Sequence, residues 1–366
     1  MTKLNDLFEH GGQSPWLDNI RRSWIQDGTL SELVNKGIRG LTSNPTIFTK
    51  AIEGSADYDE QFYGLIKDGL TVEAAYWELV KTDINGALDI LSKTYDNSNG
   101  RDGFVSIEVS PLLARDTENT LKMAVELNKV INKPNLLVKI PATKEGLPAI
   151  TEMIAEGRSV NITLIFSLER YGEVIDAYMS GLEKSIESGE TDLSKTASVA
   201  SFFVSRVDTE VDKRLLAVGG DKAQSLMGKA AVAQAKLAYE LFQERFSSSR
   251  WLEIEKYGAQ VQRPLWASTS TKNPSYPDLL YVDNLIGPST VNTMPDNTVE
   301  AFLDHGKVKT TVNSGIDEVK SELAEIESLG ISMAEVTDLL EQEGIDSFRN
   351  SFVELLDTLG KKAANK

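Results

Sequence analysis

Short apolar runs alternate along the chain with longer stretches in which apolar residues recur at helical spacing. The short runs predict strands, and the longer stretches predict amphipathic helices such as 116–131, 167–187 and 228–246. Because helices separate the strands, the pattern favours a parallel (β/α)8 barrel, an α/β fold of the TIM type. Strand order alone leaves an open doubly wound sheet as the alternative. The candidate strands lie near residues 15–19, 38–44, 104–110, 136–141, 160–166, 198–204, 263–268 and 284–293.

Two of the candidate strands carry polar side chains at alternate positions. In 104–110, Glu108 lies on the face opposite the apolar residues, and in 160–164 Asn161 and Thr163 do the same. Alternation with period two places successive side chains on opposite faces of a strand. An amphipathic sheet open to water would give the same pattern, but the helices that follow the strands are expected to cover the apolar face. The polar residues are therefore predicted to converge inside the barrel.

Lys139 stands inside an otherwise apolar strand, 136–141. An isolated charge in a dry interior is costly, so this lysine must be paired, solvated in a cavity or neutral. A neutral, desolvated amine can attack a ketone and form a Schiff base. The alternative is a lysine at the strand end whose long side chain reaches the surface. Lys144, which follows the strand, is expected to be solvated and protonated.

The tail of the chain has helical patterns without further strands. We expect it to pack on the barrel or to close over its mouth; a helix pair that binds a partner is the alternative. Polar stretches at 183–195 and 247–262 predict excursions outside the barrel. The whole chain, 1–366, is expected to form one domain. Its barrel is predicted at about 14–295 and its C-terminal extension at about 296–366, with tail helices at 317–329, 332–343 and 346–359.

Composition and charge exclude several classes of function. The 38 Lys and Arg against 55 Asp and Glu give a net charge of −17, which argues against a broad surface for nucleic acid or anionic membranes. The chain has no cysteine, and its two histidines, His10 and His305, are too far apart in sequence to indicate a metal cluster. Since the N-terminus lacks the apolar core of a signal peptide and no run has transmembrane length, we expect a cytoplasmic protein.

Several separated motifs, taken together, resemble those of transaldolases. They are GLTSNPTIF at 40–48, Glu108, VKIPATKEGL at 138–147, Asn161 to Thr163 and SFFVSR at 201–206, in the order which that family shows. The resemblance spans about residues 14–295 and implies a (β/α)8 barrel of the class I aldolase type with extra C-terminal helices.

The resemblance also implies an activity in the non-oxidative pentose phosphate pathway. A dihydroxyacetone unit is transferred from sedoheptulose 7-phosphate or fructose 6-phosphate to glyceraldehyde 3-phosphate or erythrose 4-phosphate. No metal ion or organic cofactor is expected, because the protonated Schiff base on a lysine is itself the electron sink.

The same resemblance gives four residues a catalytic role. Lys139 forms the Schiff base, and Asp18 takes the proton from the substrate hydroxyl as the carbon–carbon bond breaks. Glu108 and Thr163 hold a water that carries protons during formation of the Schiff base. Two of these roles have a plainer alternative: Asp18 as only a helix N-cap in place of a catalytic base, and Glu108 as a partner that only balances the charge of Lys139.

Three further residues are expected to bind the sugar hydroxyls. Asn44 and Asn161 carry amides that can hydrogen-bond the dihydroxyacetone part, and Ser201 adds a hydroxyl. For Asn44 the alternative is structural, because Asn-Pro is a common start of a turn.

The phosphate group is expected to contact Arg206, Ser268 and Lys272. Arg206 can make a charge-assisted hydrogen bond to phosphate, or it can be a helix arginine paired with Asp208 or Glu210. The segment after the seventh predicted strand, 266–274, departs from the family pattern, in which an arginine closely follows the serine. Here Lys272 is the nearest cation, and a lysine is a point charge rather than a planar fork.

Two other functions remain as alternatives: an aldolase that releases free dihydroxyacetone, and a sugar-phosphate-binding barrel without catalysis. The presence of Lys139, Glu108 and Asp18 argues against the second. The sequence indicates either a monomer or a homodimer and does not distinguish them.

Overall fold

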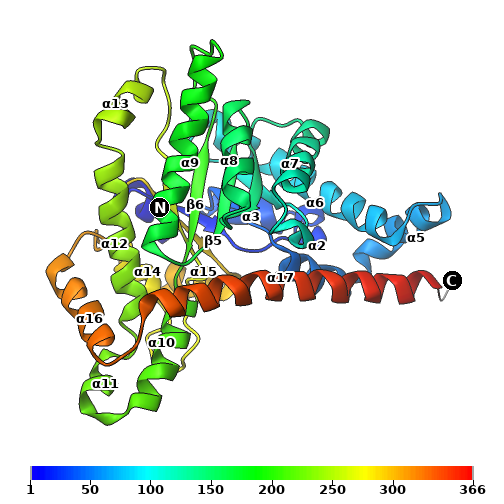
Figure 1. The fold of residues 1–366 in the computed structure, drawn as a ribbon. Coiled ribbons are helices and arrows are strands. Elements are labelled where there is room, and N and C mark those ends of the chain that lie inside the picture. Colours follow the sequence, from blue (N-terminus) through cyan, green and yellow to red (C-terminus); the bar gives the residue numbers. More distant parts are fainter. Residues whose placement is uncertain (1, 365–366) are drawn as a thin grey trace.

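The computed structural model describes residues 2–364 and contains eight parallel strands closed into a barrel. Figure 1 shows the whole fold, with helices packed around the strands. The strands pair in chain order, and β8 pairs with β1 to close the ring. This closure confirms the predicted barrel and excludes the open sheet. The strands are β1 (Gln13–Leu17), β2 (Gly40–Leu41), β3 (Phe104–Glu108), β4 (Leu136–Pro141), β5 (Val160–Ile165), β6 (Ser198–Phe203), β7 (Arg263–Ala267) and β8 (Thr290–Met294).

Helices surround the barrel, and several begin where the sequence places a capping side chain. Asp116 accepts a hydrogen bond from the backbone N–H of Asn119, and Ser167 accepts one from that of Arg170, which fixes the starts of α7 and α9. The helices are α1 (Lys3–Glu9), α2 (Arg22–Gln26), α3 (Thr29–Asn35), α4 (Pro45–Glu53), η1 (Ala56–Tyr58), α5 (Asp59–Lys67), α6 (Val72–Asn97), η2 (Pro111–Leu113), α7 (Thr117–Ile131), α8 (Gly146–Ala155), α9 (Leu168–Glu187), α10 (Ser205–Val218), α11 (Gly220–Leu226), α12 (Ala230–Arg245), α13 (Ser249–Glu255), α14 (Leu280–Asn284), α15 (Asp296–His305), α16 (Ile316–Ser328) and α17 (Met333–Ala364).

The last strand was predicted to begin too early. Its predicted start at residue 284 is the end of α14, and β8 begins only at Thr290. The apolar residues between them are buried but do not join the ladder, because the carbonyl of Leu285 accepts hydrogen bonds from the side chains of Gln13 and Trp266. Pro288 then lacks the N–H that a strand would need.

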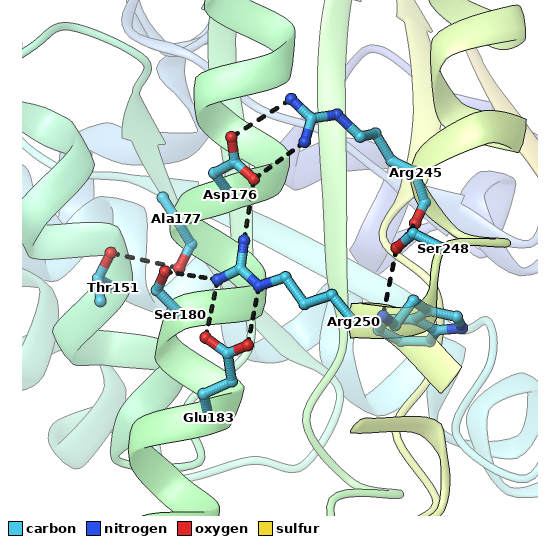
Figure 2. Close-up of polar contacts among 9 residues, drawn as sticks. Thr151, Asp176, Ala177, Ser180, Glu183, Arg245, Ser248 and Arg250 are labelled. Atoms are coloured by element: carbon cyan, nitrogen blue, oxygen red, sulfur yellow. Dashed lines mark hydrogen bonds and ion pairs between the residues drawn. The ribbon is translucent and has the colours of Figure 1, made fainter. Parts of the chain in front are cut away.

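The two predicted excursions pack against each other on the outside of the barrel. The first begins with the last turn of α9, and the second contains α13. Figure 2 shows how Arg250 joins them: its guanidinium lies 2.7 Å from Glu183 and 3.0 Å from Asp176, both on α9. Beneath this surface contact, Trp251 is buried and its ring centroid lies 4.7 Å from that of Phe246.

The C-terminal extension begins with α15, which packs on α1, and continues with two helices that have different positions. Helix α16 packs on α12 and α11, outside the barrel, whereas α17 contacts α4, α10, η2 and β5 and so lies over the carboxyl ends of the strands. In Figure 1 it is the long helix, coloured orange to red, that runs across the lower half of the view to the C-terminus. The prediction of two helices here was wrong, since α17 continues through Gly344 without a break. Within residues 2–364, no helix is both long and apolar enough to span a bilayer.

Candidate active site

A cavity of about 150 Å³ opens at the carboxyl ends of the barrel strands, under α17. This is the end of a (β/α)8 barrel at which catalytic residues gather. Seven of the ten candidate residues line it: Asp18, Asn44, Lys139, Ser201, Arg206, Ser268 and Lys272. Glu108 lines a smaller adjoining cavity together with Asn44. Asn161 and Thr163 lie deeper, buried within the barrel.

The strand register brings Lys139 beside Glu108. The two residues are direct partners on β4 and β3, so their side chains leave the sheet on the same face. The Lys139 Nζ atom lies 3.2 Å from Glu108 Oε2 and donates a hydrogen bond of 3.2 Å to the carbonyl of Ser43. Lys139 is 4% exposed, so it does not reach the surface, whereas Lys144 is exposed. Lys139 is therefore a buried, paired lysine that faces a cavity.

Glu108 has an oxygen atom available for a further ligand. Burial raises the pKa of its carboxyl group, while the charge of Lys139 opposes the shift and that of Asp18 adds to it. Its Oε1 atom and the Oγ1 atom of Thr163 are both buried without a hydrogen-bond partner among the residues that the structure describes. Buried polar atoms need partners, and ordered water commonly supplies them.

Asp18 follows β1 at the rim of the cavity. Its carboxylate accepts a 2.7 Å hydrogen bond from Thr42, which also contacts Thr293 across 2.6 Å. Burial raises the pKa of Asp18, although Lys139, the Thr42 hydrogen bond and Lys272 oppose the shift. Arg21, and not Asp18, is the N-cap residue of the next helix, α2. The Asp18 carboxylate therefore does not cap that helix.

Asn44 and Asn161 differ in how many atoms of the side-chain amide remain free to bind a ligand. Asn44 caps α4, because its Oδ1 atom accepts a 2.9 Å hydrogen bond from the backbone of Ile47, and only its NH2 group remains for a ligand. Asn161 makes a hydrogen bond through each end of its amide: it donates to Ser106 over 3.0 Å and accepts from Ser201 over 2.8 Å. Asn161 thus links β3, β5 and β6 below the cavity.

Arg206 and Lys272 place two positive charges on one side of the cavity. Arg206 makes no ion pair with any residue in the described part of the chain, and both of its suggested partners are engaged elsewhere. Glu210 binds Lys213 and Arg214, and Asp208 accepts a hydrogen bond from Tyr281. Partial burial and then the charge of Arg206 lower the pKa of Lys272, which indicates that the two cations are close.

The loop after β7, which carries Lys272, is tied to α10, which carries Arg206. At its start Ser268 has a φ of +58°, a strained value for a residue other than glycine, and its hydroxyl lies 2.9 Å from that of Ser205. Further along, Tyr276 donates a 2.6 Å hydrogen bond to Asp212. Two hydrogen bonds therefore fix the loop to α10, one at Ser205 and one at Asp212.

Comparison with known proteins identifies the family. The profile of the transaldolase/fructose-6-phosphate aldolase family matches residues 15–359. The chain belongs to this family. It is 51% identical over 358 residues to a transaldolase of Parafrankia sp. (strain EAN1pec), a match that covers 97% of this chain and 96% of the relative. Transaldolases of Thermobifida fusca and Mycolicibacterium smegmatis are each 50% identical, with 96% and 97% of this chain covered and 96% of each relative.

In this transaldolase-family chain, seven of the residues that line the cavity were not predicted from the sequence, and two of them, Thr42 and Phe348, contact candidate catalytic residues. Thr42 lies within the GLTSNPTIF segment, and its place two residues before Asn44, on the same face of an extended chain, was a usable signal. Phe348 lies in the C-terminal extension, and its ring centroid is 5.8 Å from the Lys139 Nζ atom. No local pattern marks that phenylalanine, because helical apolar residues are usually core residues.

Proposed function

We propose that this protein is a transaldolase that transfers a dihydroxyacetone unit through a Schiff base on Lys139. The donors are sedoheptulose 7-phosphate or fructose 6-phosphate, and the acceptors are glyceraldehyde 3-phosphate or erythrose 4-phosphate. The observation that carries the proposal is a buried lysine, beside a buried glutamate, in a cavity that also holds Asp18 and two cations. Transaldolase is also the name of the relatives that match nearly the whole chain.

The reaction uses the residues in a definite order. The Lys139 amine adds to the ketose carbonyl, and a water held by Glu108 and Thr163 carries the protons needed to expel hydroxide as water. Asp18 then takes the proton from the C4 hydroxyl, the C3–C4 bond breaks, and an aldose phosphate leaves. The remaining enamine attacks the acceptor aldehyde, and the same steps run in reverse. No metal ion or organic cofactor is needed.

Binding of the two ends of the sugar is assigned to different walls of the cavity. The NH2 group of Asn44 and the hydroxyl of Ser201 bind the dihydroxyacetone end, with Asn161 orienting Ser201 from below. Arg206, Ser268 and Lys272 bind the phosphate by charge-assisted hydrogen bonds. Three features of the proposal concern the whole chain: one domain over residues 1–366, a cytoplasmic location, and a monomeric or homodimeric state.

Borohydride trapping tests the proposal. The protein is incubated with fructose 6-phosphate, reduced, and examined by intact mass and peptide mapping. We expect one reduced adduct on Lys139, no adduct in Lys139→Ala, and an unchanged adduct in Lys144→Ala. An adduct on Lys144 would move the nucleophile out of the barrel. Folded protein that binds the sugar phosphate but gives no adduct would exclude Schiff-base chemistry.

A further inference from the structure

Helix α17 is fastened over the cavity from both sides. On one side the hydroxyls of Ser351 and Thr46, on α4, lie 2.9 Å apart, and Thr49 donates to the Ser351 carbonyl over 3.1 Å. On the other side Arg115 donates to Gln342 over 2.9 Å, and Arg170 pairs with Glu341 over 3.5 Å. The segment between these attachments therefore crosses the barrel mouth in a fixed position.

The helix approaches the barrel most closely at Gly344. A methyl group at this position would lie 2.9 Å from Leu164 Cδ2 and 3.7 Å from Arg206 Nη1. Leu164 itself has a φ of +61° at a register irregularity between β5 and β6. A glycine on the helix and an irregular strand end thus let α17 lie directly on the mouth.

Phe348 lies one helical turn beyond Gly344 and lines the same cavity as Lys139. Its ring is 4% exposed, and the ring centroid lies 5.8 Å from the Lys139 Nζ atom. The ring is therefore part of the cavity wall that α17 contributes near the reactive nitrogen. The face of an aromatic ring also favours a nearby cation, such as the iminium form of a lysine.

The lysine-bound enamine of the proposed mechanism must be shielded from water. After the C3–C4 bond breaks, the electron pair is shared between C3 and the lysine nitrogen as an enamine. Attack of C3 on an aldehyde gives transfer. If C3 instead takes a proton, the resulting iminium adds water at C2, the lysine amine leaves, and free dihydroxyacetone is released. Exclusion of water from a closed site suppresses side reactions of this kind.

We propose that Phe348 sets the partition of this intermediate: by keeping bulk water from C3 of the lysine-bound three-carbon unit, it slows protonation of C3 and so favours transfer to an aldehyde over release of free dihydroxyacetone. This inference rests on the function proposed above. It assigns the C-terminal helix a part in the choice between an aldehyde and water as the acceptor.

The test measures both products in one reaction with fructose 6-phosphate and erythrose 4-phosphate. The ratio of dihydroxyacetone to sedoheptulose 7-phosphate depends on the site and not on the fraction of folded enzyme. In Phe348→Ala we expect this ratio to rise about tenfold, equivalent to about 1.4 kcal/mol between two competing barriers. Phe348→Leu, which keeps most of the apolar volume, should give a smaller rise and remains informative if the alanine variant folds poorly.

Phe352→Ala is the matched control. Phe352 lies one turn further along α17, is fully buried, and packs on Tyr76 with ring centroids 5.3 Å apart, but it does not line the cavity. We expect it to lower stability and to leave the ratio unchanged. An unchanged ratio in both Phe348 variants, or an equal rise in Phe352→Ala, would overturn the inference. Wild-type enzyme that forms no sedoheptulose 7-phosphate would overturn the proposed function instead.

Discussion

Replacement of Lys272 by alanine tests the proposed phosphate site, which lacks the arginine that the resemblance to transaldolases leads us to expect after β7. Lys272 lines the cavity next to Arg206, and its loop is fixed to α10 through Tyr276. Desolvation and the charge of Arg206 lower the pKa of Lys272, so a dianionic phosphate placed between the two cations would relieve their repulsion. Loss of the ammonium group should therefore weaken phosphate binding.

The size of the effect follows from the exposure of the two cations. A hydrogen bond to a charged group contributes about 1.5–3 kcal/mol, and the exposed Lys272 belongs at the lower end of that range. About 1.5 kcal/mol corresponds to roughly a tenfold fall in kcat/KM for fructose 6-phosphate. Arg206→Ala should cost more, because Arg206 is less exposed and has a planar donor group. Lys272→Arg should keep most of the activity.

The assay combines initial rates with competitive inhibition by inorganic phosphate. Lys272→Ala should raise the inhibition constant of phosphate by about the same factor as it lowers kcat/KM, since both report the same contact. Lys50→Ala is the control: Lys50 contributes positive charge nearby but lines a neighbouring cleft. If Lys272→Ala leaves both constants unchanged, or if Lys50→Ala changes them as much, Lys272 is not the second phosphate ligand.

Three further changes test other parts of the site and the fold. Burial raises the pKa of Asp18, and the proposed base must be ionised. The pKa of the acid limb in the pH profile of kcat/KM should therefore lie above the ordinary aspartate pKa of about 3.9. Asp18→Asn should lower kcat by a factor of about 10²–10⁴. Tyr276→Phe removes the hydrogen bond to Asp212 that holds the loop carrying Lys272. KM for fructose 6-phosphate should therefore rise, and the free energy of unfolding should fall by about 1 kcal/mol. Gly40→Ala would place a methyl group 2.4 Å from the Trp16 ring and should lower the free energy of unfolding, measured with denaturant, by about 3 kcal/mol. The control Gly64→Ala lies in open space on α5 and should leave this free energy unchanged or raise it by up to about 1 kcal/mol.

The barrel was predictable because its signal is local. Alternation in β3 and β5 decides which face each side chain takes, and the structure places Glu108 and Asn161 inside the barrel on the expected face. The same signal does not say how far a side chain reaches. Lys139 and Asn161 are register partners, yet the long lysine lines the cavity, and the short amide stays below it, bound to its neighbours.

The remaining features depend on contacts between distant segments, which no local pattern records. Two tail helices were predicted on either side of Gly344, but α17 is continuous, and the glycine at this position lets the helix approach Leu164. The sequence around Phe348 predicts an ordinary core residue, and only the path of α17 over the barrel mouth shows that its ring lies near Lys139. The late start of β8 has the same origin, since side chains of other strands bind the carbonyl of Leu285.

The ion pair between Lys139 and Glu108 and the proposed nucleophilic attack make opposite demands on one amine. An ammonium group held by a carboxylate is well stabilised but has no lone pair for attack. Burial raises the pKa of Glu108, so this carboxylate accepts a proton more readily than an exposed glutamate does. A proton that passes across the 3.2 Å contact, or through a water held with Thr163, leaves a free amine beside a neutral acid. In the proposed mechanism that acid then returns the proton to the departing hydroxyl of the carbinolamine, so the pair which balances charge in the resting enzyme also supplies the acid for dehydration.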